Sequence, residues 1–469
     1  MMWDLKKFSG QTAVITETGE EISYDRLFEL TDALAGAVNR RCLAFCLCSN
    51  TLGSLIGYAS FLNHGIVPLM LDAHIAPDLL EHFLTAYRPD YLWVPAEQAA
   101  DFEGEKVYES CEYALIKRAD KNVYPLYEEL ALLLTTSGST GSPKFVRQSY
   151  KNIQANTRSI VEYLKLDSTE RPITTLPMNY TYGLSIINTH LAVGAAIILT
   201  KATLMQREFW TLFTEQGATS FGGVPYTYEM LDKLMFFRRK LPSLRTMTQA
   251  GGKLLPDLHK KFAEYAGREG KNFVVMYGAA EATARMAYLP AEKSLEKYGS
   301  MGIAIPGGKF RLIDDAGAEI TTPETVGELV YSGANVTLGY AVCGEDLAKG
   351  DERNGVLQTG DMAKFDADGF YYVVGRKKRF LKIFGNRVGL DETERLIKSY
   401  YTGLECACAG KDDAMYVFIT DAGKTDELKK FLAEKTHLNP TAFHVKALDV
   451  IPKNDAGKTL YRELEKFYD

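Results

Sequence analysis

The chain has 469 residues, of which 46% are hydrophobic and 24% charged, with a formal net charge of -6. This length allows more than one domain of about 100–200 residues. The composition is typical of a globular protein, and the negative charge argues against a nucleic-acid-binding protein. No apolar run reaches the roughly 18 residues of a membrane span, and the N-terminus lacks the basic start and apolar core of a signal peptide. We therefore expect a protein without a signal peptide or a membrane span.

Strands and helices alternate in the first hundred residues. Two short strands are predicted at 13–15 and 20–24, and Ser23 is placed to cap a helix with Leu27, Leu30, Leu34 and Val38 on one face. The next elements are predicted as strands at 42–48, 66–71 and 91–94, with helices at 52–64 and 77–87 between them. Such alternation is typical of an α/β protein with parallel or mixed sheets.

The cysteines indicate a reducing compartment. Cys42, Cys46 and Cys48 alternate along one predicted strand, and Cys406 and Cys408 have the same spacing in another. Residues at i and i+2 share one face of a strand, so these thiols are expected to be buried and reduced rather than bound to zinc or joined in disulfides. A cytoplasmic location fits this pattern best.

A glycine- and hydroxyl-rich segment follows the apolar run at 132–134. It extends from Thr135 to Lys144 and reads TTSGSTGSPK. Glycines let the backbone approach a ligand closely, hydroxyls add donors, and the lysine adds positive charge, so the segment suits a polyphosphate. Neither a Walker A loop nor the GxSxG nucleophile elbow can be placed on it. The alternative is an ordinary surface turn rich in serine and glycine.

The rest of the chain changes in predicted secondary structure near Tyr298 and in net charge near Arg376. Ser149 is expected to cap a helix to about Leu164, before further strands at 173–176, 195–199, 220–224 and 273–276. Beyond about Tyr298, short β segments at 310–313, 327–331 and 369–374 indicate a barrel-like β subregion. From Arg376 onward, 18 Lys/Arg stand against 15 Asp/Glu, whereas the preceding part is net negative. We therefore expect an N-terminal domain over 1–375 and a C-terminal domain over 376–469.

Four further motifs join the phosphate-type segment in a fixed order. They are YGAAE at 277–281, QTGD at 358–361, GRKKRFLKIFG at 375–385 and NDAGK at 454–458. With ISYDRL at 22–27, they make the chain resemble the acyl-adenylate-forming superfamily, which includes acyl- and aryl-CoA synthetases and peptide-synthetase adenylation domains. The resemblance implies a large N-terminal domain of helix-covered mixed sheets with a β-barrel subregion, and a small mobile α+β lid.

The resemblance also implies a two-step reaction. A carboxylic acid is first joined to the α-phosphorus of ATP with release of pyrophosphate, and a thiol then attacks the acyl-adenylate. Because two anions must meet in the first step, the site needs positive charge and aligned donors. The residues that match the family's phosphate loop are Thr136, Ser137, Gly138, Ser139, Thr140, Gly141 and Lys144.

Other residues take their roles from the same resemblance. Glu281 matches the Mg²⁺ ligand, and a carboxylate suits this hard cation. Tyr277 matches the ring that stacks on adenine, Asp361 and Arg376 match the ribose ligands, and Gly252 is also assigned to the nucleotide side. The catalytic assignments are Lys458, as the lysine that contacts the reacting carboxylate, with Lys144, Glu281 and Lys382. Lys378 matches the hinge, and Lys382 and Gly385 lie on the thiolation-side loop. A solvated face or a nucleic-acid patch is the alternative for residues 376–379.

The chain departs from the family pattern at two positions. Phe145 stands where glycine usually follows the loop lysine, and Ala280 replaces the usual Thr or Ser, which removes one hydrogen bond of about 0.5–1.5 kcal/mol. Gly183 stands where amino-acid-activating members carry an aspartate, and burying an α-ammonium without an anion is costly. An aromatic or fatty acid is therefore expected. The candidate acid-pocket residues are Tyr180, Tyr182, Gly183, Val224, Gly251, Gly252, Ala279 and Ala280.

These features predict an ATP- and Mg²⁺-dependent ligase that forms AMP and activates a carboxylic acid without an α-amino group. The acyl acceptor would be coenzyme A or the phosphopantetheine of an acyl carrier protein. Two alternatives stay open: a stand-alone amino-acid adenylating enzyme that loads a carrier protein, and a weakened nucleotide-binding relative without turnover.

Overall fold

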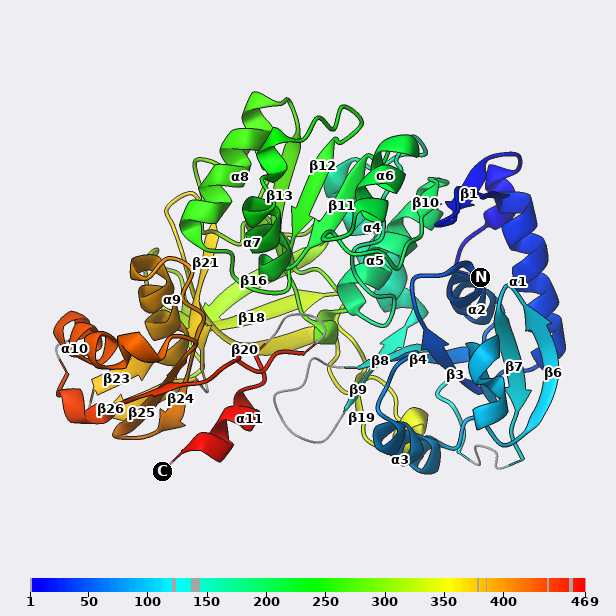
Figure 1. The fold of residues 1–469 in the computed structure, drawn as a ribbon. Helices are drawn as coiled ribbons and strands as arrows, with labels where there is room; N and C mark the ends of the chain where they lie inside the picture. Colours follow the sequence, from blue (N-terminus) through cyan, green and yellow to red (C-terminus); the bar gives the residue numbers. More distant parts are fainter. Residues whose placement is uncertain are drawn as a thin grey trace.

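The computed structural model describes residues 2–119, 124–135, 144–377, 379–384, 386–436, 438–454 and 459–468. Figure 1 shows mixed sheets covered by helices, with the N-terminal sheet at one end of the molecule and the segment from α9 onward at the other. The expected α/β class is confirmed. Among the described residues, no helix combines the length and apolar character that crossing a membrane requires.

The N-terminal part is built on an eight-stranded sheet. Its strands run in the order β19-β9-β8-β4-β3-β5-β7-β6, and the four central strands are parallel. The bounds are β3 Leu43–Cys48, β4 Val67–Asp72, β5 Tyr91–Pro95, β6 Glu105–Ser110, β7 Tyr113–Lys117, β8 Leu130–Thr135, β9 Phe145–Ser149 and β19 Gly339–Ala341. The strands predicted at 42–48, 66–71 and 91–94 are therefore confirmed within one or two residues.

Strand β3 shows how this sheet separates two cores. Cys46 and Cys48 face one core, which contains side chains of α1 Tyr24–Val38 and α2 Leu52–Asn63. Phe45 and Leu47 face the other, which contains side chains of α3 Pro77–Tyr87. The alternation follows from the two-residue period of a strand. All seven cysteines are free, and Cys42, Cys46, Cys48, Cys406 and Cys408 are buried, as expected.

Helix starts follow the predicted caps. The Ser23 hydroxyl accepts a hydrogen bond from the Arg26 backbone N–H at the start of α1. Ser149 and Asn152 form a reciprocal capping box at the start of α4 Tyr150–Leu164. Such caps satisfy backbone N–H groups that have no partner within the helix.

The middle of the chain adds a five-stranded and a three-stranded sheet. The first has the order β11-β12-β13-β14-β15, and β1 lies between β10 and β2 in the second. The bounds are β1 Thr12–Ile15, β2 Glu21–Ser23, β10 Ile197–Ile198, β11 Ser220–Gly223, β12 Thr246–Gln249, β13 Asn272–Tyr277, β14 Ala287–Tyr288 and β15 Ile303–Ala304. Helices of this region are α5 Thr181–Val193, α6 Arg207–Glu215, α7 Pro225–Lys233 and α8 Pro256–Arg268.

The strand predicted at 173–176 is wrong. Only isolated bridges form there, between Pro172 and Ser220 and between Ile173 and Ile198. Pro172 has no N–H to donate to a ladder. The hydroxyls of Thr174 and Thr175 donate hydrogen bonds to the backbone carbonyls of Thr200 and Gly222, respectively. The segment therefore crosses between two sheets instead of extending either one.

The region expected to be barrel-like is an antiparallel sheet with the order β17-β16-β18-β20-β21. The bounds are β16 Gly308–Ile313, β17 Glu319–Ile320, β18 Gly327–Gly333, β20 Val356–Phe365 and β21 Tyr371–Arg376. Among the described strands, β17 and β21 form its two edges and do not pair with each other. A bridge between Gly302 and Tyr371 connects β21 to the segment that enters β15.

The C-terminal part has its own core. Its elements are β22 Phe380–Ile383, β23 Asn386–Gly389, α9 Leu390–Tyr400, β24 Cys406–Lys411, β25 Ala414–Ile419, α10 Thr425–Thr436, β26 Phe443–Ala447 and α11 Tyr461–Leu464. The two apolar clusters of this part contain only residues from Leu381 onward. The boundary between residues 375 and 376 stays a prediction that these clusters support.

Candidate active site

The phosphate-type segment leaves one strand and enters its neighbour. Thr135 at the end of β8 pairs with Phe145 at the start of β9. The assigned residues Thr136, Ser137, Gly138, Ser139, Thr140 and Gly141 lie outside the described residues. Lys144 is described, and its ammonium nitrogen lies 5.3 Å from the centroid of the Tyr340 ring. Of the residues assigned to the phosphate loop, the structure thus describes Lys144.

Tyr340 links Lys144 to the predicted metal ligand. It lies on β19, opposite Val146 of β9. The Tyr340 hydroxyl donates a 2.6 Å hydrogen bond to Oε1 of Glu281, and the Arg353 guanidinium lies 4.6 Å from the Tyr340 ring centroid. Sequence reasoning missed Tyr340 and Arg353. No local signal identifies them, because strand pairing and loop packing bring them to the site.

Glu281 is held by a strained backbone turn. It lies in the short 3-10 helix Ala280–Ala282, and its backbone carbonyl accepts hydrogen bonds from Arg353 and Thr337. Thr283 then takes φ 66° and ψ -63°, and the Ala284 N–H donates to the Ala282 carbonyl at 2.7 Å. This geometry is a classic-type γ-turn, which is rare and strained for a non-glycine residue. The surrounding contacts fix the direction in which the Glu281 segment leaves β13.

Gly278 allows this turn to pack against β13. A Cβ at Gly278 would lie 1.7 Å from the Ala284 carbonyl oxygen. No side chain fits so close to a backbone carbonyl, so glycine is required at the second position of the YGAAE motif.

The predicted ribose ligands form a hydrogen-bonded group. Asp361 on β20 and Arg376 on β21 are register partners, and Nε of Arg376 lies 2.6 Å from Oδ1 of Asp361. The Tyr277 hydroxyl donates to Oδ2 of the same carboxylate. Asp361 is 4% exposed. Burial raises its pKa, while Arg376 and the Tyr277 hydrogen bond oppose that rise.

Tyr277 is fixed by the Asp361 hydrogen bond and by the neighbouring core. Its ring centroid lies 6.5 Å from that of Phe310. Burial and the adjacent Asp361 raise the pKa of the phenol well above its usual value, so the hydroxyl stays a donor. Adenine stacking by Tyr277 stays a prediction.

Three of the predicted acid-pocket residues meet at Gly251. A Cβ at Gly251 would lie 2.6 Å from the Tyr180 hydroxyl and 3.1 Å from a Val224 methyl group, and its φ is 86°. Tyr182 is buried beside them, with its hydroxyl 2.8 Å from that of Thr248. Tyr180, Tyr182 and Val224 belong to an apolar cluster with Leu176, Ala250, Val274 and Met276.

Gly183 packs closely against the backbone of residues 176–177. A Cβ there would lie 2.4 Å from the Pro177 carbonyl oxygen. An aspartate at this position would therefore require the segment to move. Gly252 is exposed beside Pro225, Ala279 precedes the Glu281 turn, and Ala280 packs partly against the N-terminal core.

Phe145, the replacement for the family's glycine, is a core residue. It is fully buried, and its ring lies edge-on to Phe83 and Tyr87 of α3, at centroid distances of 4.8 and 5.3 Å. The extra side chain thus points into the core below the sheet.

The basic residues at 376–379 are neutralised by carboxylates wherever they are described. Arg376 contacts Asp361, and Lys377 contacts Glu328 at 2.8 Å. Arg379 binds Asp391 and Glu394. These ion pairs argue against a nucleic-acid patch. The hinge candidate Lys378, the side chain of Lys382, and Gly385 lie outside the described residues.

The catalytic candidate Lys458 also lies outside the described residues. On either side of its segment, Lys453 and Thr459 form an antiparallel bridge. The Lys453 ammonium is 2.8 Å from Glu405 and 5.5 Å from the ring centroid of Tyr226 on α7. Since Tyr226 follows Val224 by two residues, Lys453 lies beside the helix that begins at the acid-pocket cluster.

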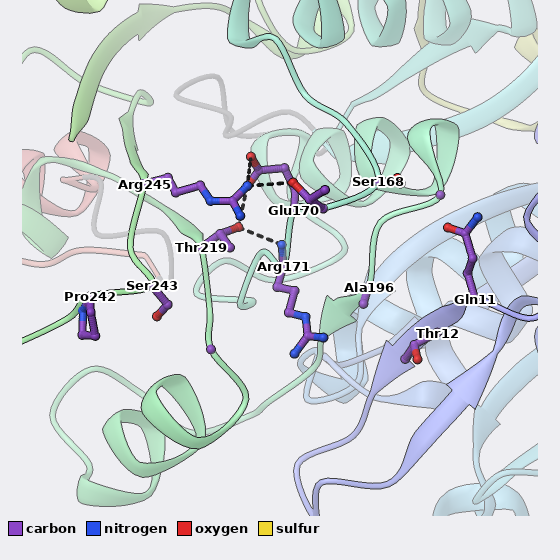
Figure 2. A pocket seen from close by; sticks show the side chains of 13 residues that line it. Gln11, Thr12, Ser168, Glu170, Arg171, Ala196, Thr219, Pro242, Ser243 and Arg245 are labelled. Atoms are coloured by element: carbon purple, nitrogen blue, oxygen red, sulfur yellow. Dashed lines mark hydrogen bonds and ion pairs between the residues drawn. The ribbon is translucent and has the colours of Figure 1, made fainter. Parts of the chain in front are cut away.

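A separate polar cavity of about 560 Å³ contains none of the predicted site residues. Figure 2 shows Glu170, Arg171, Thr219 and Arg245 in its wall. Glu170 accepts from the Thr219 hydroxyl and pairs with Arg245 at 3.4 Å. Arg171 donates to the Gln216 carbonyl. The charged side chains Glu170, Arg171 and Arg245 of this cavity are thus bound to other protein groups, so we assign the cavity no catalytic role.

Glu281 fits a magnesium site that uses substrate phosphates. Its Oε1 accepts the Tyr340 hydroxyl, and no side chain among the described residues bonds to Oε2, which could therefore serve as a ligand atom. Mg²⁺ is typically held by one or two carboxylates together with phosphate oxygens. In the part of the chain that the structure describes, no group of three or more His, Cys, Asp or Glu could hold a metal by itself.

The site thus combines a lysine beside a phosphate-type segment, a carboxylate suited to a divalent cation, and a carboxylate–arginine pair suited to a ribose. A family model of AMP-binding enzymes matches residues 2–341. The chain belongs to this family.

Several proteins similar to this chain are named as CoA ligases. Residues of the chain are 28% identical to the peroxisomal OPC-8:0-CoA ligase 1 of Arabidopsis thaliana, over 72% of this chain and 64% of that protein. They are 27% identical to the 2-succinylbenzoate–CoA ligase of Bacillus mycoides, over 79% and 77%. The chain spans less than two thirds of the length of several relatives, with 64%, 61% and 64% for three CoA ligases.

A solved structure supports the fold over nearly the whole chain. The O-succinylbenzoate coenzyme A synthetase of Bacillus subtilis, in complex with AMP, has a TM-score of 0.79 at 21% identity and covers 98% of this chain and 97% of that one. The two proteins therefore share their overall architecture.

Proposed function

We propose that the protein is an AMP-forming carboxylic acid–thiol ligase that uses ATP and Mg²⁺. The observation that carries this proposal is that Tyr340 contacts both Lys144, through its ring, and Glu281, through its hydroxyl, in a chain of the AMP-binding family. The names of its relatives, such as 2-succinylbenzoate–CoA ligase and feruloyl-CoA synthase, support coenzyme A as the acceptor. The acid would lack an α-amino group, and the tight backbone approach at Gly183 supports this. The free cysteines support a reducing compartment such as the cytoplasm.

In the first step, a carboxylate oxygen attacks the α-phosphorus of ATP, and the bond to the bridging oxygen of the pyrophosphate breaks. Lys144 and its segment would hold the phosphates that leave. Asp361 and Arg376 would position the ribose, because the carboxylate can accept hydroxyl protons. Lys458 would stabilise the charge that develops between the acid and the α-phosphate. Mg²⁺ bound at Glu281 would supply neutralising charge to the phosphate oxygens.

In the second step, a thiolate attacks the acyl carbon, and the bond to the AMP oxygen breaks. We propose that the C-terminal part turns about Lys378 and presents the segment of Lys382 to the thiol. Such a change of orientation lets one scaffold use two sets of groups in turn.

Exchange of radiolabelled pyrophosphate into ATP tests the first step. A panel of aromatic acids, fatty acids and amino acids would be assayed, and we expect exchange with carboxylic acids that lack an α-amino group. Exchange only with amino acids would indicate the stand-alone adenylating enzyme, and absence of exchange with every acid would indicate a binding protein. Coenzyme A and a phosphopantetheinylated carrier protein, supplied separately, would then identify the acceptor.

Lys458→Ala tests the assigned catalytic lysine. We expect the exchange rate to fall by about 100-fold or more while ATP binding is nearly unchanged, because one charge that acts on the transition state is lost. Lys466→Ala is the control, since Lys466 is an exposed lysine of the same C-terminal part. Equal exchange rates in Lys458→Ala and the wild type would refute the mechanism.

A further inference from the structure

Arg285 is a buried cation without a carboxylate partner among the described residues. It lies between the Glu281 turn and β14, and it is 3% exposed. Its backbone is fixed on both sides: its carbonyl accepts hydrogen bonds of 2.9 Å from Asn156 and Asn335, and its N–H donates to Asn156. These hydrogen bonds fix the backbone of Arg285 and therefore the point from which its side chain extends.

The guanidinium lies among aromatic rings and sulfur. Its central carbon is 3.8 Å from the centroid of the Tyr182 ring, and Nε donates to the Met276 sulfur at 3.2 Å. It also acts electrostatically on the phenols of Tyr163 and Tyr180, and in both cases it opposes the rise of the phenol pKa that burial causes. We call Arg285 with Tyr163, Tyr180 and Tyr182 the tyrosine–arginine cluster.

Two other arginines, one buried and one half-buried, have carboxylate partners. The Arg147 side chain is fully buried, and it pairs with Glu352 and donates to the backbone carbonyl of Tyr340. Arg379 pairs with both Asp391 and Glu394. Burying a cation is costly unless an anion and hydrogen bonds compensate it. Tyrosine faces and a thioether compensate only part of that cost.

The tyrosine–arginine cluster overlaps the predicted acid-binding region. Tyr180 and Tyr182 contact each other edge-on at 6.3 Å, and the Tyr180 hydroxyl lies against Gly251 and close to Val224. The positive charge of Arg285 therefore stands beside the groups that would surround the acid. The reacting carboxylate is already assigned to Lys458, so Arg285 is available to a second anionic group.

We propose that Arg285 is a specificity-determining residue that binds a second carboxylate, so that the preferred substrates are dicarboxylic acids activated at one end. This inference rests on the proposed ligase function and narrows its substrate class. A guanidinium suits the task because its planar array of N–H donors matches the two oxygens of a carboxylate. The tyrosine rings would contact the carbon chain or ring between the two acid groups.

Matched acid pairs test the proposal by pyrophosphate exchange. Succinic, glutaric, adipic and phthalic acids would each be compared with the corresponding monoamide, which has nearly the same shape and one charge fewer. For the best pair, we expect kcat/KM of the wild type to favour the dicarboxylic acid by about 10- to 100-fold, the range expected for hydrogen bonds to a charged group.

Variants assign the preference to Arg285. Arg285→Met keeps much of the length and removes the charge, and we expect it to lose the preference for the dicarboxylic acid and to accept the monoamide equally well. Arg285→Lys should retain part of the preference. Arg245→Met is the matched control, because Arg245 lies in the separate cavity of Figure 2 and its loss should leave the preference unchanged.

The outcomes separate the inference from the function on which it rests. A wild type that activates monocarboxylic acids and monoamides as well as dicarboxylic acids would overturn the role of Arg285 and leave the ligase function standing. An unchanged preference in Arg285→Met would do the same. Absence of exchange with every acid would overturn the ligase function itself. If Arg285→Met does not fold, as judged by its thermal unfolding, the wild-type preference and Arg285→Lys decide the question.

Discussion

Tyr340→Phe removes the hydroxyl group of the tyrosine that lies between Lys144 and Glu281 in the proposed phosphate site. The hydroxyl donates to Oε1 of Glu281 at 2.6 Å, while the ring stays beside Lys144 and Arg353 in the variant. Burial and the neighbouring Glu281 raise the pKa of Tyr340 to about 12, so the group is a donor throughout the pH range of an assay. The substitution therefore tests how well the Glu281 carboxylate is oriented.

The expected effect of Tyr340→Phe is weaker binding of Mg²⁺ at Glu281. Removal of a group that orients a metal ligand typically costs about 10- to 100-fold in metal affinity or activity. Tyr340 is 36% exposed, so water replaces part of the lost hydrogen bond. We therefore expect the lower end, an increase of about tenfold in the Mg²⁺ concentration for half-maximal exchange, which corresponds to about 1.4 kcal/mol.

The assay is pyrophosphate exchange at a series of free Mg²⁺ concentrations. Tyr372→Phe is the matched control, because it removes another tyrosine hydroxyl that donates to a carboxylate, that of Asp366 at 3.2 Å. In a Glu281→Gln background, Tyr340→Phe should have little further effect, since the two groups act together. An unchanged Mg²⁺ dependence in Tyr340→Phe, or equal effects of the single substitution in both backgrounds, would refute this reasoning.

Two further predictions concern stability. Burial lowers the pKa of His259 to about 4, and its Nδ1 accepts the Gly299 N–H, so the folded protein holds this imidazole neutral while the unfolded chain protonates it below about pH 6.5. The contribution of His259 to the free energy of unfolding is therefore fully present above pH ~6.5 and decreases as the pH falls toward ~4. At pH ~5 the decrease is about 2 kcal/mol. Urea unfolding of His259→Gln should show a smaller change with pH than the wild type, and an identical change would contradict the assignment. Phe145→Ala should lower the free energy of unfolding by about 3–5 kcal/mol, because it empties a buried site between Phe83 and Tyr87. Urea unfolding would measure it, with Phe145→Leu as the milder control, and a change in the KM for ATP without a loss of stability would instead place this ring at the nucleotide.

The sequence predicted most local structure because its causes are local. Ser23 and Ser149 cap helices through contacts within three residues along the chain. The alternating cysteines around Cys46 share a face because the strand period is two residues. The prediction at 173–176 failed where tertiary hydrogen bonds drew two threonines away from a ladder.

The site was predicted in part. The motifs located Lys144, Glu281, Asp361 and Arg376, and the structure brings Asp361 to Arg376 and connects Lys144 to Glu281 through Tyr340. The roles of these residues stay predictions, as do those of Lys378, Lys382 and Lys458.

By itself, the sequence determined the family, the α/β class and the positions of the motif residues, since these follow from short patterns in a fixed order. Only the tertiary structure decided that Phe145 is a core residue, that Tyr340 bridges Lys144 and Glu281, and that Arg285 is buried beside Tyr182 without a carboxylate among the described residues. The physical reason is that these properties depend on contacts between segments far apart in the chain. Charge pairing and burial are set by those contacts, and no spacing within the sequence encodes them.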